Sequence, residues 1–478
     1  MAKAAAAPTN SRERDRLCRI LIAAIVLAGL ALVAYGYWPG IMIDDARWQY
    51  QQAVDNAYED WHPPLMAWIW RRLMFLQPGP APMLLLQLLL YWGGIALIAL
   101  WAYRRAPRMS VAIAFAGLIP APLALLGAVT KDCLMAGALT CATGLVFEAG
   151  EASSPVRRSI VSVAALIALL FAAALRFNAF LACVPLALAA LPRSFTSTAL
   201  RSAATALTAS AIFLAAGPAV STLVQAENTK VNLSLILFDL GGITERSGKS
   251  AFPDMGVRNP VAVNRECYDP KQWDGYSSWA KTPCPLGFDR FETLVDDDDV
   301  SPISFWLHAI ADHPLAYAEH RLDHFNQSTF FLVRSGPEFT AWTASVPNPW
   351  NFQVRRNPAL RAVSAYADLA ARTPFGWPCF WIALGLAAFV TAVSTGMDRK
   401  LVAIAASAPL YGLGYLVFGV ATGMRYHVWT ITGAALAAAL VFGELLRTGT
   451  RVRNGWLIVA AGIAALPTCI AMASRLIL

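Results

Sequence analysis

Charged side chains are scarce in this chain of 478 residues. Asp, Glu, Lys and Arg make up only 14% of it, whereas hydrophobic residues make up 57%. Soluble domains carry roughly a quarter charged residues, so this scarcity excludes a wholly soluble enzyme. The sequence also lacks a Gly-rich phosphate loop, which excludes nucleotide binding through that motif. It shows no internal repeat of matching length, which argues against a transporter built from inverted halves.

The charge that is present is biased, with 38 Lys and Arg against 30 Asp and Glu, a net charge of +8. In an apolar chain such an excess reports cytoplasmic loops through the positive-inside rule, and we predict no nucleic-acid partner. Four arginines, at positions 12, 14, 16 and 19, precede the first apolar run. They place the N-terminus in the cytoplasm and make that run an uncleaved anchor.

Apolar runs long enough to cross a bilayer recur along the chain, since a spanning helix needs about 20 mostly apolar residues. Hydropathy predicts about eleven transmembrane spans. They cover residues 20–38, 82–103, 110–129, 133–148, 160–175, 180–191, 203–224, 378–393, 401–421, 428–446 and 456–473. The chain is therefore predicted to be a polytopic α-helical protein of the inner (plasma) membrane, with an external C-terminus.

These spans divide the chain into three parts. Residues 1–224 form an N-terminal transmembrane catalytic module with a first outer loop at 40–80, and residues 377–478 form the C-terminal transmembrane helices. Residues 225–376 form a periplasmic or extracellular domain. Strand-like patches such as 231–238 and a helix over 304–332 predict a mixed α/β fold for it.

Two cysteines of this domain suggest a disulfide, and two of its histidines raise the question of a metal site. Cys267 and Cys284 are its only cysteines, and an oxidising compartment favours a disulfide between them. His320 and His324 have zinc-ligand spacing, but the acid between them is Asp323 and the segment also fits an amphipathic helix, so no metal site is predicted. The aromatic residues of the domain either form its core or stack on sugar rings: Trp273, Tyr276, Trp279, Trp342 and Trp350.

Acidic residues directly follow the first span, at the start of the first outer loop. Asp44 and Asp45 precede a stretch of helical composition, and Asp60, Trp61 and His62 follow it. A carboxylate poised at the membrane surface can accept a proton from a hydroxyl group, so we predict a reaction site here. The alternative is that the Asp pair caps the following helix, since Asp is favoured at helix N-termini.

Cations lie on the same predicted outer face, at the ends of spans. Lys131, Arg176 and Arg425 could each hold phosphate oxygens, with Asp132 beside them in a supporting role. The two histidines of that face, at positions 62 and 427, could also bind phosphate. The alternative for each cation is snorkelling to lipid headgroups.

Four short motifs together resemble a known family. They are Asp-Asp-Ala-x-Trp at 44–48, Trp-His-Pro-Pro at 61–64, Lys-Asp at 131–132 and Arg-Phe-Asn-Ala at 176–179. They are similar to motifs of the membrane glycosyltransferases of the GT-C class, in the branch of protein mannosyltransferases and aminoarabinose transferases. The resemblance covers about the first 200 residues.

The resemblance implies a GT-C-like fold and an inverting glycosyltransferase. A sugar would pass from a polyprenyl-phosphate donor to an extracytoplasmic glycan, lipid-linked glycan or protein acceptor, with Asp44 or Asp45 as the base. Mannosyltransferase relatives usually carry Glu where this chain has Asp45, which leaves open which acid is the base. No cofactor is assigned, and a divalent cation stays open. The alternative function is a multi-pass transporter or flippase of a lipid-linked or anionic substrate.

Overall fold

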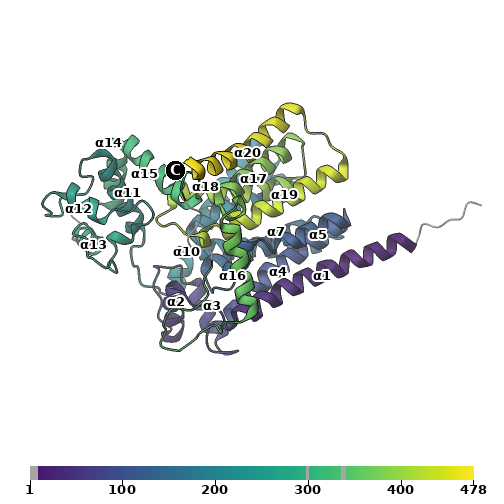
Figure 1. The fold of residues 1–478 in the computed structure, drawn as a ribbon, viewed down its shortest axis with the longest axis horizontal. Helices are drawn as coiled ribbons and strands as arrows, with labels where there is room; N and C mark the ends of the chain where they lie inside the picture. Colours follow the sequence, from purple (N-terminus) through teal and green to yellow (C-terminus); the bar gives the residue numbers. More distant parts are fainter. Residues whose placement is uncertain (1–8, 298–300, 335–340, 478) are drawn as a thin grey trace, which may run out of the picture.

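Two bodies make up the molecule, a bundle of long helices and a smaller polar domain at one end of it (Figure 1). The computed structural model describes residues 9–297, 301–334 and 341–477. The bundle contains α1 (Thr9–Tyr37), α4 (Ala81–Tyr103), α5 (Pro107–Ala116), α6 (Pro120–Leu125), α7 (Lys131–Ala149), α8 (Pro155–Leu175), α9 (Phe180–Ala190), α10 (Ala199–Leu223), α17 (Pro378–Ser394), α18 (Arg399–Phe418), α19 (Val428–Thr448) and α20 (Asn454–Ile477).

The remaining elements lie at or near the polar end. The polar domain, as we call it from here on, consists of α11 (Asn232–Ser247), α12 (Pro260–Cys267), α13 (Phe288–Asp296), α14 (Pro302–Asp312) and α15 (Pro314–Thr329) with the 3₁₀ turn η3 (Trp273–Tyr276). The first loop forms α2 (Asp44–Asp55) and α3 (Leu65–Leu73), and α16 (Pro358–Ala371) runs across the bundle. The other 3₁₀ turns are η1 (Phe177–Ala179), η2 (Arg193–Thr196), η4 (Pro374–Gly376) and η5 (Met424–His427).

Eight helices of the described residues are long and apolar enough to cross a membrane, and the chain is a multi-pass membrane protein. They are Arg16–Tyr37, Ala81–Tyr103, Lys131–Ala149, Pro155–Leu175, Ala199–Leu223, Arg399–Phe418, Met424–Thr448 and Asn454–Ile477. Two further apolar helices, Phe177–Ala190 and Pro378–Ser394, are shorter. The predicted count of about eleven spans is therefore not confirmed.

The predicted span 110–129 is not one helix. It is divided into α5 and α6, because the chain turns at Gly117 and restarts at Pro120. The irregular backbone that follows keeps its carbonyl groups satisfied through Gln87, whose side-chain amide donates to the carbonyl oxygens of Leu126 (2.7 Å) and Ala128 (2.9 Å). Backbone without helix is tolerated at such depth only where protein groups take over its hydrogen bonds.

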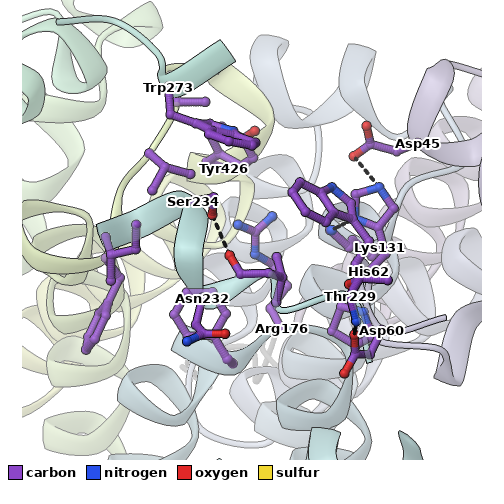
Figure 2. A pocket seen from close by; sticks show the side chains of 18 of the residues that line it. Asp45, Asp60, His62, Lys131, Arg176, Thr229, Asn232, Ser234, Trp273 and Tyr426 are labelled. Carbon is purple, nitrogen blue, oxygen red and sulfur yellow. Dashed lines mark hydrogen bonds and ion pairs between the residues drawn. The ribbon is translucent and has the colours of Figure 1, made fainter. Parts of the chain in front are cut away.

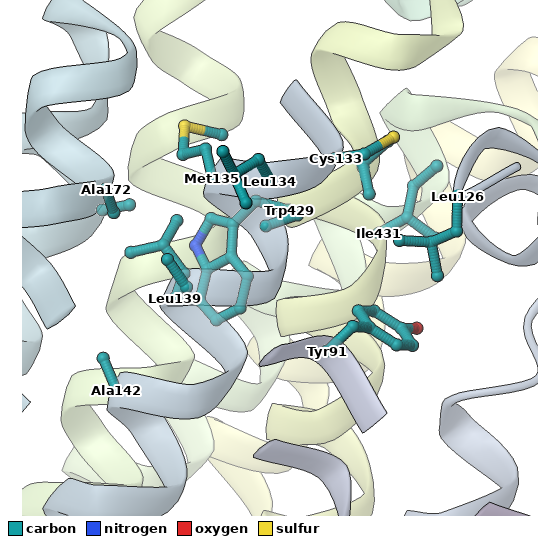
Figure 3. Close-up of a cluster of buried hydrophobic side chains, with 14 of the residues drawn as sticks. Tyr91, Leu126, Cys133, Leu134, Met135, Leu139, Ala142, Ala172, Trp429 and Ile431 are labelled. Atoms are coloured by element: carbon teal, nitrogen blue, oxygen red, sulfur yellow. The ribbon is translucent and has the colours of Figure 1, made fainter. Parts of the chain in front are cut away.

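Small residues let the helices of the bundle approach closely. A Cβ atom on Gly94 of α4 would lie 2.4 Å from the backbone carbon of Thr140 in α7, so only glycine fits there. Figure 3 shows a buried cluster of the bundle, with Leu139 beside the indole of Trp429. That indole is fully buried, and its N–H donates to the hydroxyl of Ser407 at 3.1 Å.

The turns that the sequence predicts on the cytoplasmic side contact one another. Arg105 after α4 pairs with Glu151 after α7 at 2.8 Å, and Lys400 of α18 lies 3.8 Å from the same carboxylate. Arg399 donates to the carbonyl oxygen of Leu191, the residue after α9, at 2.8 Å. Four separate turns therefore meet at one end of the bundle, and two of them supply the basic residues.

The described part of the polar domain consists of helices, turns and irregular loops without a strand, so the prediction of a mixed α/β fold is not confirmed. The patch 231–238, predicted to be strand-like, lies almost entirely in α11. Its buried residues Leu233, Ile236, Leu237 and Leu240 follow the i, i+3, i+4, i+7 spacing of a helix face. The predicted helix over 304–332 is split into α14 and α15 at Pro314, which cannot donate a backbone hydrogen bond. The predicted disulfide between Cys267 and Cys284 is confirmed, with 5.9 Å between the Cα atoms.

Candidate active site

A cavity of about 2120 Å³ lies where the first loop, the ends of the bundle helices and the polar domain meet. All three parts contribute to its wall. The predicted site residues Asp44, Asp45, Asp60, Trp61, His62, Lys131, Arg176 and Arg425 line it. Figure 2 shows several of these side chains, with a dashed line from the Asp45 carboxylate to the ring of His62.

The two acids of the first loop differ in their surroundings. Both stand in the first turn of α2, and the N-cap residue Ile43 makes no side-chain capping bond, so neither acid is the cap. The side chain of Asp44 is 69% exposed and contacts Arg47 at 3.4 Å. That of Asp45 is 21% exposed and contacts Arg425 at 3.0 Å. Of these two acids, Asp45 is therefore the one that pairs with a cation from the bundle side of the cavity.

Three different segments supply those cations. Lys131 begins α7, Arg176 follows α8, and Arg425 lies in η5. Arg176 donates to the buried carboxylate of Asp132, and the Nε atom of Arg425 lies 3.9 Å from the same group. Residues far apart in the chain therefore form one cluster.

An aromatic ring holds the two guanidinium groups next to each other. Arg176 and Arg425 lie 4.9 Å and 5.0 Å from the centre of the Tyr426 ring. Arg425 also donates to the Tyr426 hydroxyl at 3.1 Å. Such cation–π contacts fix the positions of the two arginines without neutralising their charge.

His62 connects Lys131 to Asp45. Its Nδ1 atom contacts the Lys131 ammonium group, which has only hydrogens to donate, so Nδ1 accepts and Nε2 carries the proton. Nε2 lies 3.8 Å from the Asp45 carboxylate. Burial, and after it the charge of Lys131, lowers the pKa of His62 to about 3, so the ring is neutral at pH 7.

The cluster carries one positive charge that no carboxylate balances. Burial by itself would raise the pKa of Asp45, but Arg425, His62 and Lys131 together hold it below its ordinary value, so Asp45 is ionised. Asp45 pairs with Arg425 and Asp132 pairs with Arg176. The contact of Lys131 with a neutral imidazole leaves its charge available to an anion.

Not every predicted residue joins this cluster. His427 is fully buried and contacts the hydroxyl of Ser328 at 3.1 Å, away from the cavity wall. Asp60 accepts hydrogen bonds from the backbone N–H (2.7 Å) and the hydroxyl (2.8 Å) of Thr229, and so ties the first loop to the segment before α11. Trp61 packs against aromatic rings of the polar domain.

The aromatic residues of the domain divide between core and cavity. Trp273 and Tyr276 are buried in the core of the polar domain, and the ring of Trp350 packs on Tyr50 at 4.6 Å. Trp273 also lines the cavity, as does Trp342. Trp279 is 54% exposed and lines the cavity. Asp274 also lines the cavity, and the sequence gives no local pattern that marks it as a site residue.

The described residues contain no group of three or more His, Cys, Asp or Glu that could hold a metal ion. The His320 and His324 side chains make other contacts. His320 contacts the hydroxyl of Tyr268 at 2.9 Å and the carboxylate of Asp239 at 3.3 Å, while His324 donates to the carbonyl oxygen of Pro270 at 2.8 Å.

Comparison with known proteins gives structural neighbours only. No family model and no curated protein matches the sequence. The chain is similar to the Archaeoglobus fulgidus oligosaccharyltransferase in complex with zinc and sulfate, at 13% identity and a TM-score of 0.40 over 95% of this chain and 53% of that one. It is also similar to ArnT from Cupriavidus metallidurans bound to undecaprenyl phosphate, at 14% identity and a TM-score of 0.31 over 90% of this chain and 78% of that one.

Both neighbours are GT-C membrane glycosyltransferases. A further similar structure is the archaeal oligosaccharyltransferase AglB with an inhibitory peptide and a dolichol-phosphate, at 12% identity and a TM-score of 0.38. It covers 96% of this chain and 56% of that one. The chain thus spans about half the length of the archaeal enzymes it matches.

Proposed function

We propose that the chain is a membrane glycosyltransferase that moves a sugar from a polyprenyl-phosphate donor to an acceptor outside the cytoplasm. The observation that carries this proposal is the cluster of Lys131, Arg176 and Arg425 around one large cavity. These residues come from three segments, and their charge exceeds that of the two carboxylates paired with them. Such a group binds a phosphate in preference to a neutral ligand.

Apolar side chains favour a lipid as the carrier of that phosphate. Phe177, Leu214 and Phe418 line the same cavity, and each belongs to or adjoins a helix of the bundle. A lipid phosphate would place its charge at the cations and its chain along these residues. The absence of a Gly-rich nucleotide loop from the sequence agrees with a lipid donor.

In the reaction, Asp45 accepts the proton of an acceptor hydroxyl group while the hydroxyl oxygen attacks the anomeric carbon. The bond from that carbon to the phosphate oxygen breaks on the opposite side, so the configuration inverts. The departing polyprenyl phosphate keeps the bonding electrons, and the cations stabilise its charge. When the donor phosphate pairs with Arg425, the ion pair between Arg425 and Asp45 weakens. The pKa of Asp45 then rises, and Asp45 becomes a stronger base.

We also propose the orientation in the membrane. The paired basic turns around Arg105 and Lys400 would face the cytoplasm, and the cavity and polar domain would face the opposite side. Figure 1 places the start of α1 and the polar domain at opposite ends of the molecule. The positive-inside rule assigns the basic end to the cytoplasm.

The test compares Asp45→Asn with Asp44→Asn in purified protein in nanodiscs supplied with polyprenyl-phosphate sugars. We expect Asp45→Asn to lose transfer while it still binds undecaprenyl phosphate, because the cations remain. Asp44→Asn should keep most of the activity, since Asp44 is exposed and contacts none of the cluster's cations. Turnover at the wild-type rate by Asp45→Asn would refute the proposal that Asp45 is the base. Failure of the wild-type protein to bind undecaprenyl phosphate would refute the proposed class.

A further inference from the structure

A second region of the cavity wall is aromatic. The Trp61 ring of the first loop lies 5.2 Å from Trp279 and 5.6 Å from Phe288 of the polar domain, both edge to face. Trp273 lies 5.3 Å from Trp279 and completes the group. All four rings line the cavity. Trp61 and Trp273 contact Trp279, whose side chain is the exposed one, and Phe288 packs on those two rings.

A carboxylate without a partner stands next to this aromatic group. Asp274 is half-buried and lines the cavity, and no described residue forms a hydrogen bond or ion pair with its side chain. The backbone around it is fixed to the segment that leads to Arg425. The Trp273 N–H donates to the Val420 carbonyl at 2.8 Å, and the Thr422 N–H donates to the Lys271 carbonyl at 2.9 Å.

Asp274 therefore faces the same reaction space as Asp45, from the opposite body of the protein. Burial, and after it the negative charge of Asp45, raises the pKa of Asp274 above its ordinary value. A carboxylate with a raised pKa is a stronger hydrogen-bond acceptor. It suits a neutral donor such as a hydroxyl group, and it repels an anion.

Other acids extend this end of the wall. Glu59, Glu227 and Asp289 line the cavity there, and burial followed by repulsion from Glu227 raises the pKa of Glu59. Acids outnumber cations at the polar-domain end of the cavity, where Lys271 also lines the wall, and the cluster of three cations lies at the bundle end. An anionic acceptor would meet repulsion at the acidic end.

We propose that Trp279 and Asp274 form the acceptor subsite, and that the acceptor is a neutral or amino-bearing glycan. This inference rests on the proposed function. A pyranose ring has an apolar face, which packs on the exposed Trp279 ring, and hydroxyl groups at its edge, which donate to Asp274. The sugar is then held between the aromatic group and Asp45, with one hydroxyl directed at the donor.

The experiment measures binding of wild-type protein, in nanodiscs with undecaprenyl phosphate, to an array of neutral, amino-bearing and acidic glycans and to an array of peptides. Wild type should bind neutral or amino-bearing glycans and not acidic ones. Trp279→Ala and Asp274→Asn should each weaken that binding by about tenfold or more. Trp279→Phe keeps an aromatic face and should retain most of it. Trp456→Ala and Asp312→Asn, which remove the same groups outside the cavity, should change nothing.

Glycan binding and lipid binding, measured on the same variants, distinguish failure of the acceptor subsite from failure of the proposed function. Lipid binding that is intact in Trp279→Ala and Asp274→Asn shows that both variants are folded and that the donor end works. Glycan binding that survives both variants, or a wild type that binds only peptides or acidic glycans, would overturn the subsite. A wild type that binds no undecaprenyl phosphate would instead overturn the proposed function.

Discussion

Replacing Lys131 by Met should weaken the binding of a lipid phosphate without unfolding the protein. Lys131 is the cation of the cluster whose contact is a neutral ring, that of His62. Its removal therefore strands no buried carboxylate. Arg176 is different, because it pairs with the buried Asp132, and its loss would leave that carboxylate uncompensated.

The expected magnitude follows from the kind of contact. A hydrogen bond to a charged group contributes about 1.5–3 kcal/mol net. Since about 1.4 kcal/mol changes an equilibrium constant tenfold, Lys131→Met should raise the Kd for undecaprenyl phosphate by about 10- to 150-fold. The effect should shrink at high salt only in part, because the cluster is shielded from solvent.

Titration of undecaprenyl phosphate into protein in nanodiscs measures this change, and thermal unfolding measures the stability of each variant. Arg72→Met is the control, since it removes an exposed cation of the first loop that stacks on Trp68 at 3.6 Å. It should bind like wild type. A Lys131→Met variant whose Kd for undecaprenyl phosphate is within about twofold of the wild-type value would refute the proposal that the charge of Lys131 binds the lipid phosphate.

Three further predictions concern stability. Asp239→Asn leaves the buried guanidinium of Arg321 unpaired and should lower the free energy of unfolding by about 3–5 kcal/mol, measured by denaturant unfolding; a loss below about 1 kcal/mol would contradict this. Burial lowers the pKa of His324 from 6.5 to about 3, so below pH 6.5 the unfolded state takes up a proton that the folded state does not. The free energy of unfolding should fall as the pH drops from 6.5 toward 3, and less steeply in His324→Gln; equal slopes would disprove it. Cys267→Ser, which removes the disulfide, should lower the free energy of unfolding by about 3 kcal/mol, whereas Cys469→Ser at an exposed free cysteine should have almost no effect.

The membrane helices could be predicted from the sequence because hydropathy is a local property. Most of the predicted runs are helices of the described structure, and the basic turns between them meet at one end. The run 110–129 could not be resolved, because the irregular backbone at its end takes its hydrogen bonds from Gln87 of another helix. The patch 231–238 is predicted to be strand-like because a run of eight residues, six of them apolar, does not show whether its period is 2 or 3.6.

Only the part of the candidate site that lies at the ends of the bundle helices could be predicted from the sequence. Asp45, Lys131 and Arg176 stand at span ends, where a charge is rare enough to be noticed. Asp274 and Trp279 belong to a polar segment in which acids and aromatic rings are common, and only the tertiary fold brings them to the cavity. His427 shows the reverse case, because a histidine at a span end looks functional while its ring is buried against Ser328.

The most direct test of the central claim is an experimental structure of the protein with undecaprenyl phosphate. We predict the phosphate in the cavity, with its oxygens about 2.7–3.0 Å from the Lys131 ammonium group and from at least one of the Arg176 and Arg425 guanidinium groups. A phosphate bound elsewhere, with these three cations in contact only with protein groups, would contradict the account.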